Sequence, residues 1–522
     1  MRRCLLVLLG SLAIPTTLFA EDALTPRDQT RALEQQIRTT IDATEPCVVA
    51  VIVSHLKYPP EHLPANEQRI PGRLGGYSPP KQPMLPAGLA ARGEDPRFDL
   101  SDPEQVGEHK FGSGLVLNEQ DGLILTNFHL IDGATKIYVR TANGSGSYAD
   151  IHAADARSDL AVLRLLEPPE GMKPVRFATV RLHDGPGDVK ATLFRGMFVI
   201  ALGHPLALGF TDGQPSASWG ILSNIRRRAA GPPLESARYR ELHRYGTLLQ
   251  TDARVTLGSS GGGLFDLDGR AIGMTAPLAA ITGADTAGGF AVPFDRNYRR
   301  IVEVLKQGKE VEYGFLGVSM PLNDGQKLRH DKGLLIGTVT PGSPAALAGL
   351  TGTNFGAANA DTILDIDGQP VRDADDLFLY IGAALAGTKV RLTVARNGQS
   401  RPVDVTLAKF YHPLPAIVSK PGPDFHGLRV DYSSMRMLKN QDVSRLVNGV
   451  TVRSVDADSQ AATRFRTLGG DPTRWMITHV DNKPVPTPTA FYEAVAGKAG
   501  VQLRLENPNE TGPTREQRLF LP

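Results

Sequence analysis

A run of glycines around two serines, Gly258-Ser-Ser-Gly-Gly-Gly263, is the feature that most restricts the fold of this chain. Glycine has no Cβ and accepts positive φ angles, so such a run forms neither a regular helix nor a regular strand. We expect a tight loop that presents Ser260 with backbone N–H groups beside it. A nucleophile next to N–H donors is what acyl transfer requires, although a plain glycine turn has the same composition.

The overall composition is that of soluble globular domains. The 522 residues are enough for roughly three or four domains. Lysine and arginine together number 57, aspartate and glutamate 55, and the net charge is +2. We therefore expect neither nucleic acid nor a membrane surface as the partner, because such binding needs a clear excess of positive charge.

Residues 1–20 have the pattern of a signal peptide. Two arginines precede an apolar run from Leu5 to Ile14, and Ala20 is a small residue at the expected cleavage point. Leu18 is large for its place before the cut, so an uncleaved N-terminal membrane anchor is the alternative. No later stretch reaches the ~18 apolar residues of a membrane span. The sequence predicts an exported protein without a membrane span after cleavage.

A helix and a long insertion are expected next. Thr25-Pro26 is typical of a helix start, and apolar residues then recur every four positions, so we predict an N-terminal helix within residues 21–45. A proline-rich stretch at 57–109 has no periodicity. We interpret it as an insertion loop in a domain that covers residues 46–308.

Many short strands are predicted from residue 111 onward. A hairpin is expected at 115–125, with Asp121-Gly122 as its turn. Short strands separated by Gly, Asp and Pro indicate a barrel or a sandwich, and a closing helix is expected at 295–307. The other predicted strands are 136–140, 160–165, 198–202, 218–223, 247–250, 263–265, 271–275 and 289–292.

Two units of about a hundred residues follow, and they repeat weakly. The stretch ILDIDGQPV at 363–371 is echoed by ITHVDNKPV at 477–485. Each echo is followed by a helix-like segment and then a strand, which indicates a duplicated module. We place the units at 312–410 and 424–522, joined by a proline-rich linker at 411–423.

Three residues of the all-β region suit a catalytic triad. A serine nucleophile needs a base within hydrogen-bond reach and a carboxylate that orients the base. His129 ends an apolar strand, and Asp159 stands at the start of another. Taken alone, an aspartate there is more typical of a turn. With Ser260 they give the order His, Asp, Ser, which chymotrypsin-like double barrels use.

Five ordered motifs resemble those of HtrA-type (Deg) serine proteases. They are TNFH at 126–129, SDLAVL at 158–163, ALGHP at 201–205, QTDA at 250–253 and GSSGG at 258–262. The resemblance implies a mostly β protein, a chymotrypsin-like double β-barrel followed by two PDZ-like α+β domains, of which the second is divergent. It further implies His129 as the base, Asp159 as the orienting carboxylate and Ser260 as the nucleophile. The N–H groups of Gly258 and Ser260 would form the oxyanion hole.

The glycine loop departs from the family pattern at three positions. Ser259 stands where the family has Asn, and Gly263 and Leu257 stand where it has Pro. Gly263 and Leu257 predict a looser loop, which leaves open whether the oxyanion hole is formed before substrate binds. Val255 is expected to make a small apolar substrate pocket, unless Arg254 points inward and attracts acidic side chains.

The first C-terminal unit resembles a PDZ domain. The N–H groups of Leu316, Gly317 and Val318 would hold a peptide C-terminus while the peptide adds a strand to the sheet. Leu377 and Ile381, on the following helix, are candidates either for the peptide groove or for the core.

These features predict an ATP-independent serine endopeptidase that degrades unfolded or damaged proteins. Its expected partners are unfolded polypeptides and peptide C-termini, the family assembles as trimers or multiples of trimers, and a bacterial periplasm fits the signal and the family. The alternative is a catalytically silent PDZ chaperone or scaffold. No metal or nucleotide motif occurs in the sequence, so no metal or other cofactor is expected. Residues 258–262 also match the G-x-S-x-G elbow of α/β-hydrolases, which requires a helix where we predict a hairpin.

Overall fold

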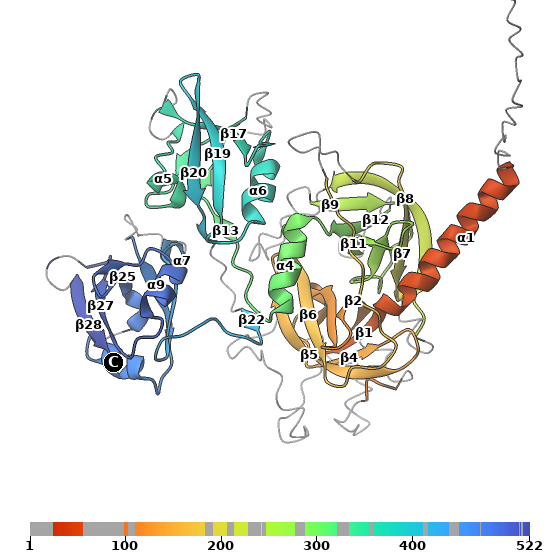
Figure 1. The fold of residues 1–522 in the computed structure, drawn as a ribbon, viewed down its shortest axis with the longest axis horizontal. Coiled ribbons are helices and arrows are strands. Elements are labelled where there is room, and N and C mark those ends of the chain that lie inside the picture. Colours follow the sequence, from red (N-terminus) through yellow and green to blue (C-terminus); the bar gives the residue numbers. More distant parts are fainter. Residues whose placement is uncertain are drawn as a thin grey trace, which may run out of the picture.

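The computed structural model describes residues 25–55, 99–102, 110–182, 192–205, 213–227, 242, 247–276, 288–320, 333–353, 356, 359–410, 416–437, 448–469, 471–510, 512 and 515–522. Two β-barrels lie together on one side of the molecule, and two smaller β-rich units lie on the other (Figure 1). The fold is therefore mostly β, as the sequence predicted. The expected signal peptide and almost all of the expected insertion loop lie outside the described residues.

Helix α1 (Pro26–Thr44) leads into the first barrel, and its outer end extends away from the body of the molecule (Figure 1). The Thr25 side chain caps its N-terminus, and a proline occupies the first turn, as expected from the sequence. At the inner end, the side chains of Gln36 and Thr40 both donate to the carbonyl of Leu267 in the second barrel. The helix is thus fixed to the barrels along its C-terminal half.

The first barrel consists of six antiparallel strands. Its elements are η1 (Glu45–Cys47), β1 (Val48–Ser54), β2 (Lys110–Asn118), β3 (Leu123–Asn127), α2 (Phe128–Ile131), β4 (Lys136–Arg140), β5 (Gly146–Asp155) and β6 (Leu160–Leu165). β1 pairs with β2 and β4, and β5 pairs with β6 to close the barrel. β1 and β3 are buried along their whole length, because their apolar side chains face both the barrel interior and the neighbouring elements.

The second barrel is also closed. Its strands are β7 (Phe198–Gly203), β8 (Ser216–Arg227), β9 (Leu248–Thr251), β10 (Gly263–Phe265), β11 (Ala271–Thr275) and β12 (Gly289–Pro293), followed by helix α4 (Arg296–Lys306). They lie in the order β10-β11-β12-β9-β8-β7. β10 and β11 form the hairpin that the sequence predicted after the glycine loop. No helix follows Ser260 there, so the hydrolase-elbow alternative is wrong.

The two C-terminal units share a layout. The first contains β13 (Gly314–Phe315), β14 (Val318–Ser319), β15 (Leu334–Leu335), β16 (Thr338–Val339), α5 (Pro344–Leu347), β17 (Thr362–Ile366), β18 (Gln369–Pro370), α6 (Ala374–Gly382), β19 (Lys389–Arg396), β20 (Gln399–Thr406) and β21 (Ala408–Lys409). The second contains β23 (Leu428–Tyr432), α7 (Ser434–Met437), β24 (Val450–Val455), α8 (Gln460–Arg466), η8 (Pro472–Arg474), β25 (Met476–Val480), β26 (Lys483–Pro484), α9 (Pro488–Val495), β27 (Val501–Glu506) and β28 (Glu516–Leu521).

A pair of glycine–serine contacts relates the two units. Gly317 and Gly427 have φ angles of +86° and +83°. A Cβ at either position would lie 2.2 Å from the Cβ of a serine, Ser343 in the first unit and Ser459 in the second. Each of these serines caps the helix that follows it, α5 or α8. The weak repeat in the sequence is therefore a repeat of structure.

The segment between the two units contacts the first barrel. Within the expected linker, β22 (Ile417–Val418) pairs with β5. Ser419 adds two bonds to His152 of the same strand, one from its backbone N–H and one between its Oγ and Nδ1 of the imidazole. This part of the linker is consequently held on the protein surface. Among the described helices, none is both long enough and apolar enough to cross a membrane.

Candidate active site

His129 lies on the short helix α2, directly after the buried strand β3. β3 pairs with β6 in a register that places Asn127 opposite Leu160. The N–H of Phe128 also donates to the carbonyl of Asp159 at 3.1 Å. This strand register is what brings the histidine beside the aspartate, 30 positions later in the sequence.

Asp159 is the last residue of the turn between β5 and β6. Its φ angle of +56° lies in the left-handed region, which aspartate tolerates better than most residues. One carboxylate oxygen accepts the backbone N–H of His129 at 2.8 Å. The other lies 2.8 Å from Nδ1 of His129 and accepts from Nδ2 of Asn127 at 3.1 Å. With the N–H at Nδ1 donating a hydrogen bond to Asp159, Nε2 is the acceptor nitrogen of the imidazole.

Ser260 faces that acceptor. Its Oγ lies 3.3 Å from Nε2 of His129, across the junction of the two barrels. Gly258 and Gly261 turn the loop, with φ angles of +92° and +84°. A Cβ at Gly261 would lie 2.1 Å from the carbonyl oxygen of Ser113, so only glycine fits there. The triad candidates are therefore brought together, with a serine–histidine contact slightly longer than an ideal hydrogen bond.

Ser113 on β2 holds the glycine loop in place. Its side chain is fully buried, and Oγ donates to the carbonyl of Gly258 at 2.8 Å and accepts from the N–H of His204 at 2.9 Å. Its backbone N–H donates to the carbonyl of Ser260 at 2.7 Å. One residue of the first barrel thus fixes both ends of the expected oxyanion segment.

The backbone N–H groups of Gly258 and Ser260 differ from that of Ser259 in their hydrogen bonding. Within the described residues neither donates to an acceptor, whereas the N–H of Ser259 between them donates to Thr256 at 3.0 Å. An oxyanion hole requires this pattern, because its two donors must be held in place by the loop without being used by it.

The positions that depart from the family pattern have distinct surroundings. A Cβ at Gly263 would lie 2.2 Å from the ring of Phe265, which is fully buried. The ring therefore occupies the space where a larger residue at 263 would stand. Gly263 also pairs with Leu202 and with Met274, so the loop leads into a strand bonded on both sides. Leu257, by contrast, is 54% exposed beside the loop.

Val255, the residue expected to line the substrate pocket, packs against β12. A Cβ at Gly289 of β12 would lie 2.5 Å from a methyl group of Val255, so the two residues pack together. Arg254 is exposed, which argues against the inward orientation that the sequence left open, and its carbonyl accepts from Ser218 Oγ at 2.9 Å. These neighbours are compatible with a small apolar pocket.

The expected carboxylate loop of the first C-terminal unit lies between β13 and β14. Leu316 and Gly317 are buried and Val318 is half-buried. Leu377 and Ile381 of α6 are 5% and 6% exposed and pack in the core of the unit. For these two residues the structure supports the core interpretation.

Three residues near the triad were missed by the sequence analysis: Ser113, Asn127 and Arg157. Ser113 stands between two glycines inside an apolar strand, and that signal could have marked it. Asn127 belongs to the TNFH motif, but only the structure shows its bond to Asp159.

Among the described residues, no cluster of three or more His, Cys, Asp or Glu side chains could hold a metal ion.

Comparison with known proteins agrees with this geometry. The trypsin-like peptidase domain matches residues 112–274, and the PDZ domain matches residues 314–407. A probable periplasmic serine endoprotease, DegP-like, from Halomonas elongata is 31% identical over 356 residues, which are 67% of this chain and 67% of that protein. The chain belongs to the HtrA (DegP-like) family of serine proteases.

Further relatives of this HtrA-family chain carry similar names. The DegP-like protein of Brucella suis is 28% identical over 416 residues, covering 77% of this chain and 72% of the relative. The periplasmic pH-dependent serine endoprotease DegQ of Escherichia coli is 30% identical over 314 residues, covering 59% and 62%. The first C-terminal unit is accordingly a PDZ domain, and the barrels form a trypsin-like serine endoprotease domain.

Proposed function

We propose that Ser260 is the nucleophile, His129 the general base and Asp159 the orienting carboxylate of this endoprotease. The observation that carries the proposal is the pair of contacts that joins them, 2.8 Å from Asp159 to Nδ1 and 3.3 Å from Nε2 to Ser260 Oγ. Ser260 Oγ attacks the scissile carbonyl while Nε2 takes its proton. Nε2 then returns this proton to the leaving amine, and water hydrolyses the acyl-enzyme in the same way.

The oxyanion hole in this mechanism consists of the N–H groups of Gly258 and Ser260. Their lack of acceptors among the described residues and the attachment of the loop to Ser113 support this assignment. Losing one such donor typically reduces transition-state stabilisation by ~2.7–4 kcal/mol. Val255 lines the pocket for a small apolar substrate side chain.

The substrates of the proposed activity are unfolded or damaged proteins in the periplasm, degraded without ATP. Relatives named periplasmic serine endoproteases support the compartment, and the absence of a nucleotide motif from the sequence supports independence from ATP. The PDZ match supports recognition of peptide C-termini at Leu316, Gly317 and Val318. Assembly into trimers or multiples of trimers follows the family resemblance, and light scattering of the purified protein measures it.

A fluorophosphonate probe tests the triad directly. The wild type is expected to be labelled and to cleave casein, whereas Ser260→Ala is expected to do neither. Ser259→Ala is the matched control, because the neighbouring serine has no contact with His129 among the described hydrogen bonds. If the wild type remains unlabelled in the presence of a C-terminal PDZ peptide and leaves casein intact, the protein is a scaffold instead.

A further inference from the structure

Arg157 is among the largest fully buried side chains of the described residues, and the triad does not use it. It lies in the turn between β5 and β6, two residues before Asp159, and it is 2% exposed. Burying a guanidinium is unfavourable unless its surroundings compensate for the lost hydration. The groups that surround Arg157 therefore show what holds this turn.

Two aromatic rings from the segments that enter and leave the PDZ domain enclose the guanidinium. Its Cζ atom lies 4.7 Å from the ring centre of Tyr313 and 4.3 Å from that of Phe410. The N–H of Phe410 donates to the carbonyl of Tyr313 at 2.7 Å, which holds the two segments side by side. A guanidinium near an aromatic face is attracted by the ring quadrupole, most strongly where water is excluded.

The end of helix α6 of the PDZ domain approaches the same side chain. A Cβ at Gly382, the last residue of α6, would lie 3.1 Å from a terminal nitrogen of Arg157. The C-terminus of a helix carries a partial negative charge and favours a nearby cation. Arg157 therefore contacts the PDZ domain at its first segment, at its last segment and at α6.

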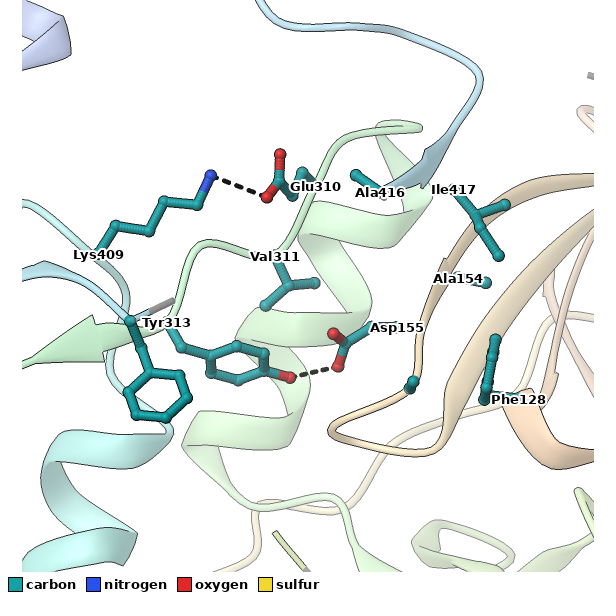
Figure 2. Close-up of a pocket in the computed structure, with 11 residues that line it drawn as sticks. Phe128, Ala154, Asp155, Glu310, Val311, Tyr313, Lys409, Ala416 and Ile417 are labelled. Atoms are coloured by element: carbon teal, nitrogen blue, oxygen red, sulfur yellow. Dashed lines mark hydrogen bonds and ion pairs between the residues drawn. The ribbon is translucent and has the colours of Figure 1, made fainter. Parts of the chain in front are cut away.

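Asp155 connects the other end of the turn to the PDZ domain. Its carboxylate accepts from the N–H of Ser158 at 2.8 Å and from the hydroxyl of Tyr313 (Figure 2). Burial and the charge of Asp155 raise the pKa of Tyr313 well above its usual range, so the hydroxyl remains a donor. A cavity of about 50 Å³ lies beside this contact. Phe128, the neighbour of His129, lines the cavity on the side opposite Tyr313 (Figure 2).

We propose that Arg157 is a positioning residue for catalysis: held between Tyr313 and Phe410, it fixes the turn that carries Asp159. Only residues 156–159 join β5 to β6, so a shift of Arg157 displaces Asp159 as well. A residue with positive φ keeps its conformation only where its surroundings impose it. Loss of the aromatic contacts would let the turn shift and carry Asp159 away from its optimal position beside Nδ1 of His129. This inference rests on the proposed triad.

The test compares Arg157→Ala and Phe410→Leu, singly and combined, in the full-length protein. The probe is a small fluorophosphonate, which needs no recruitment by the PDZ domain, and a short chromogenic peptide gives kcat and KM. Arg157→Ala is expected to lower the labelling rate constant and kcat at least tenfold, with KM within twofold of wild type. Phe410→Leu is expected to produce part of this loss. The double variant should match Arg157→Ala, because both changes remove the same contact.

Active-site titration separates positioning from a loss of folded protein. If Arg157 has a purely structural role, Arg157→Ala lowers the fraction of enzyme that is labelled, and the labelling rate constant of the folded remainder is unchanged. That result would overturn the proposal. Losses that multiply in the double variant would also overturn it, since Arg157 would then act independently of Phe410. Arg157→Lys, which keeps the charge and stays able to contact the rings, should recover part of the rate.

Two controls complete the design. Arg299→Ala removes another arginine that lies over a ring, 5.4 Å from the centre of Phe177, and it should label at the wild-type rate. Ser260→Ala must not be labelled at all. If Ser260→Ala is still labelled, the proposed triad is wrong. If it is silent and Arg157→Ala labels normally, only the role of Arg157 is wrong.

Discussion

Replacing Ser113 with alanine is expected to damage the oxyanion segment while the triad residues remain in place. The change removes a fully buried hydroxyl that donates to the carbonyl of Gly258 and accepts from the N–H of His204. The backbone bond from Ser113 to Ser260 is kept, so the variant should still fold with the same overall loop path. The peptide group between Gly258 and Ser259, however, loses the side-chain contact that fixes it, so Gly258 can shift.

The size of the effect follows from the two bonds that disappear. A buried polar group that loses its partner costs about 1–3 kcal/mol, and two backbone groups are affected here. We therefore expect the free energy of unfolding to fall by about 2–6 kcal/mol. A displaced Gly258 N–H should also lower the rate of fluorophosphonate labelling at least tenfold, which corresponds to roughly 1.4 kcal/mol in the transition state.

Urea denaturation and labelling kinetics together test this expectation. Ser147→Ala is the matched control, because Ser147 Oγ also donates to a carbonyl, that of Tyr148, and accepts from the N–H of Glu167, in a part of the first barrel remote from the loop. The control should lose comparable stability and keep its labelling rate. The reasoning is refuted if both serine variants lose stability and Ser113→Ala is still labelled at the wild-type rate.

Two further substitutions test the loop and a buried carboxylate. Gly261→Ala combines a φ of +84° with a Cβ placed 2.1 Å from a backbone oxygen, and it should lower the free energy of unfolding by roughly 2 kcal/mol or more and abolish labelling. Gly196→Ala, at φ +90° with open space around its Cβ, should lose clearly less; equal losses would contradict the steric argument. Burial raises the pKa of Asp295 from 3.8 to about 6, so the stability it contributes is complete below pH 3.8 and is lost as the pH rises through 6. Compared with Asp295→Asn, which keeps the cap on the N–H groups of Asn297 and Tyr298, the wild type should lose about 3 kcal/mol between pH 4 and pH 7 in urea titrations, and parallel curves would contradict this.

The strand pattern and the glycine loop could be read from the sequence because both depend on local chemistry. Alternation of apolar residues, turn residues and helix starts act over a few positions, and they located the β10–β11 hairpin, the helix start at Thr25-Pro26 and the closing helix. The same local reasoning expected a loosened loop from Gly263. It could not foresee that the ring of Phe265, two residues later, occupies the space beside that glycine.

The arrangement of the candidate site needed the tertiary structure. His129 and Asp159 were proposed from the order of motifs, but their contact depends on the register of β3 against β6. Ser113 reaches the glycine loop from the opposite barrel, and no spacing in the sequence relates the two. Such contacts depend on how closed barrels pack against each other, which a local pattern does not encode.

The sequence by itself determined the kind of chemistry, and the tertiary structure decided what supports it. A serine among glycines, a histidine after an apolar strand and an aspartate before another are local features, so they can be recognised in order along the chain. The enclosure of Arg157 by Tyr313 and Phe410 joins segments more than 150 positions apart. It exists only because β22 and the PDZ domain lie against the first barrel. This packing brings residues that are distant in the sequence close together in the protein interior.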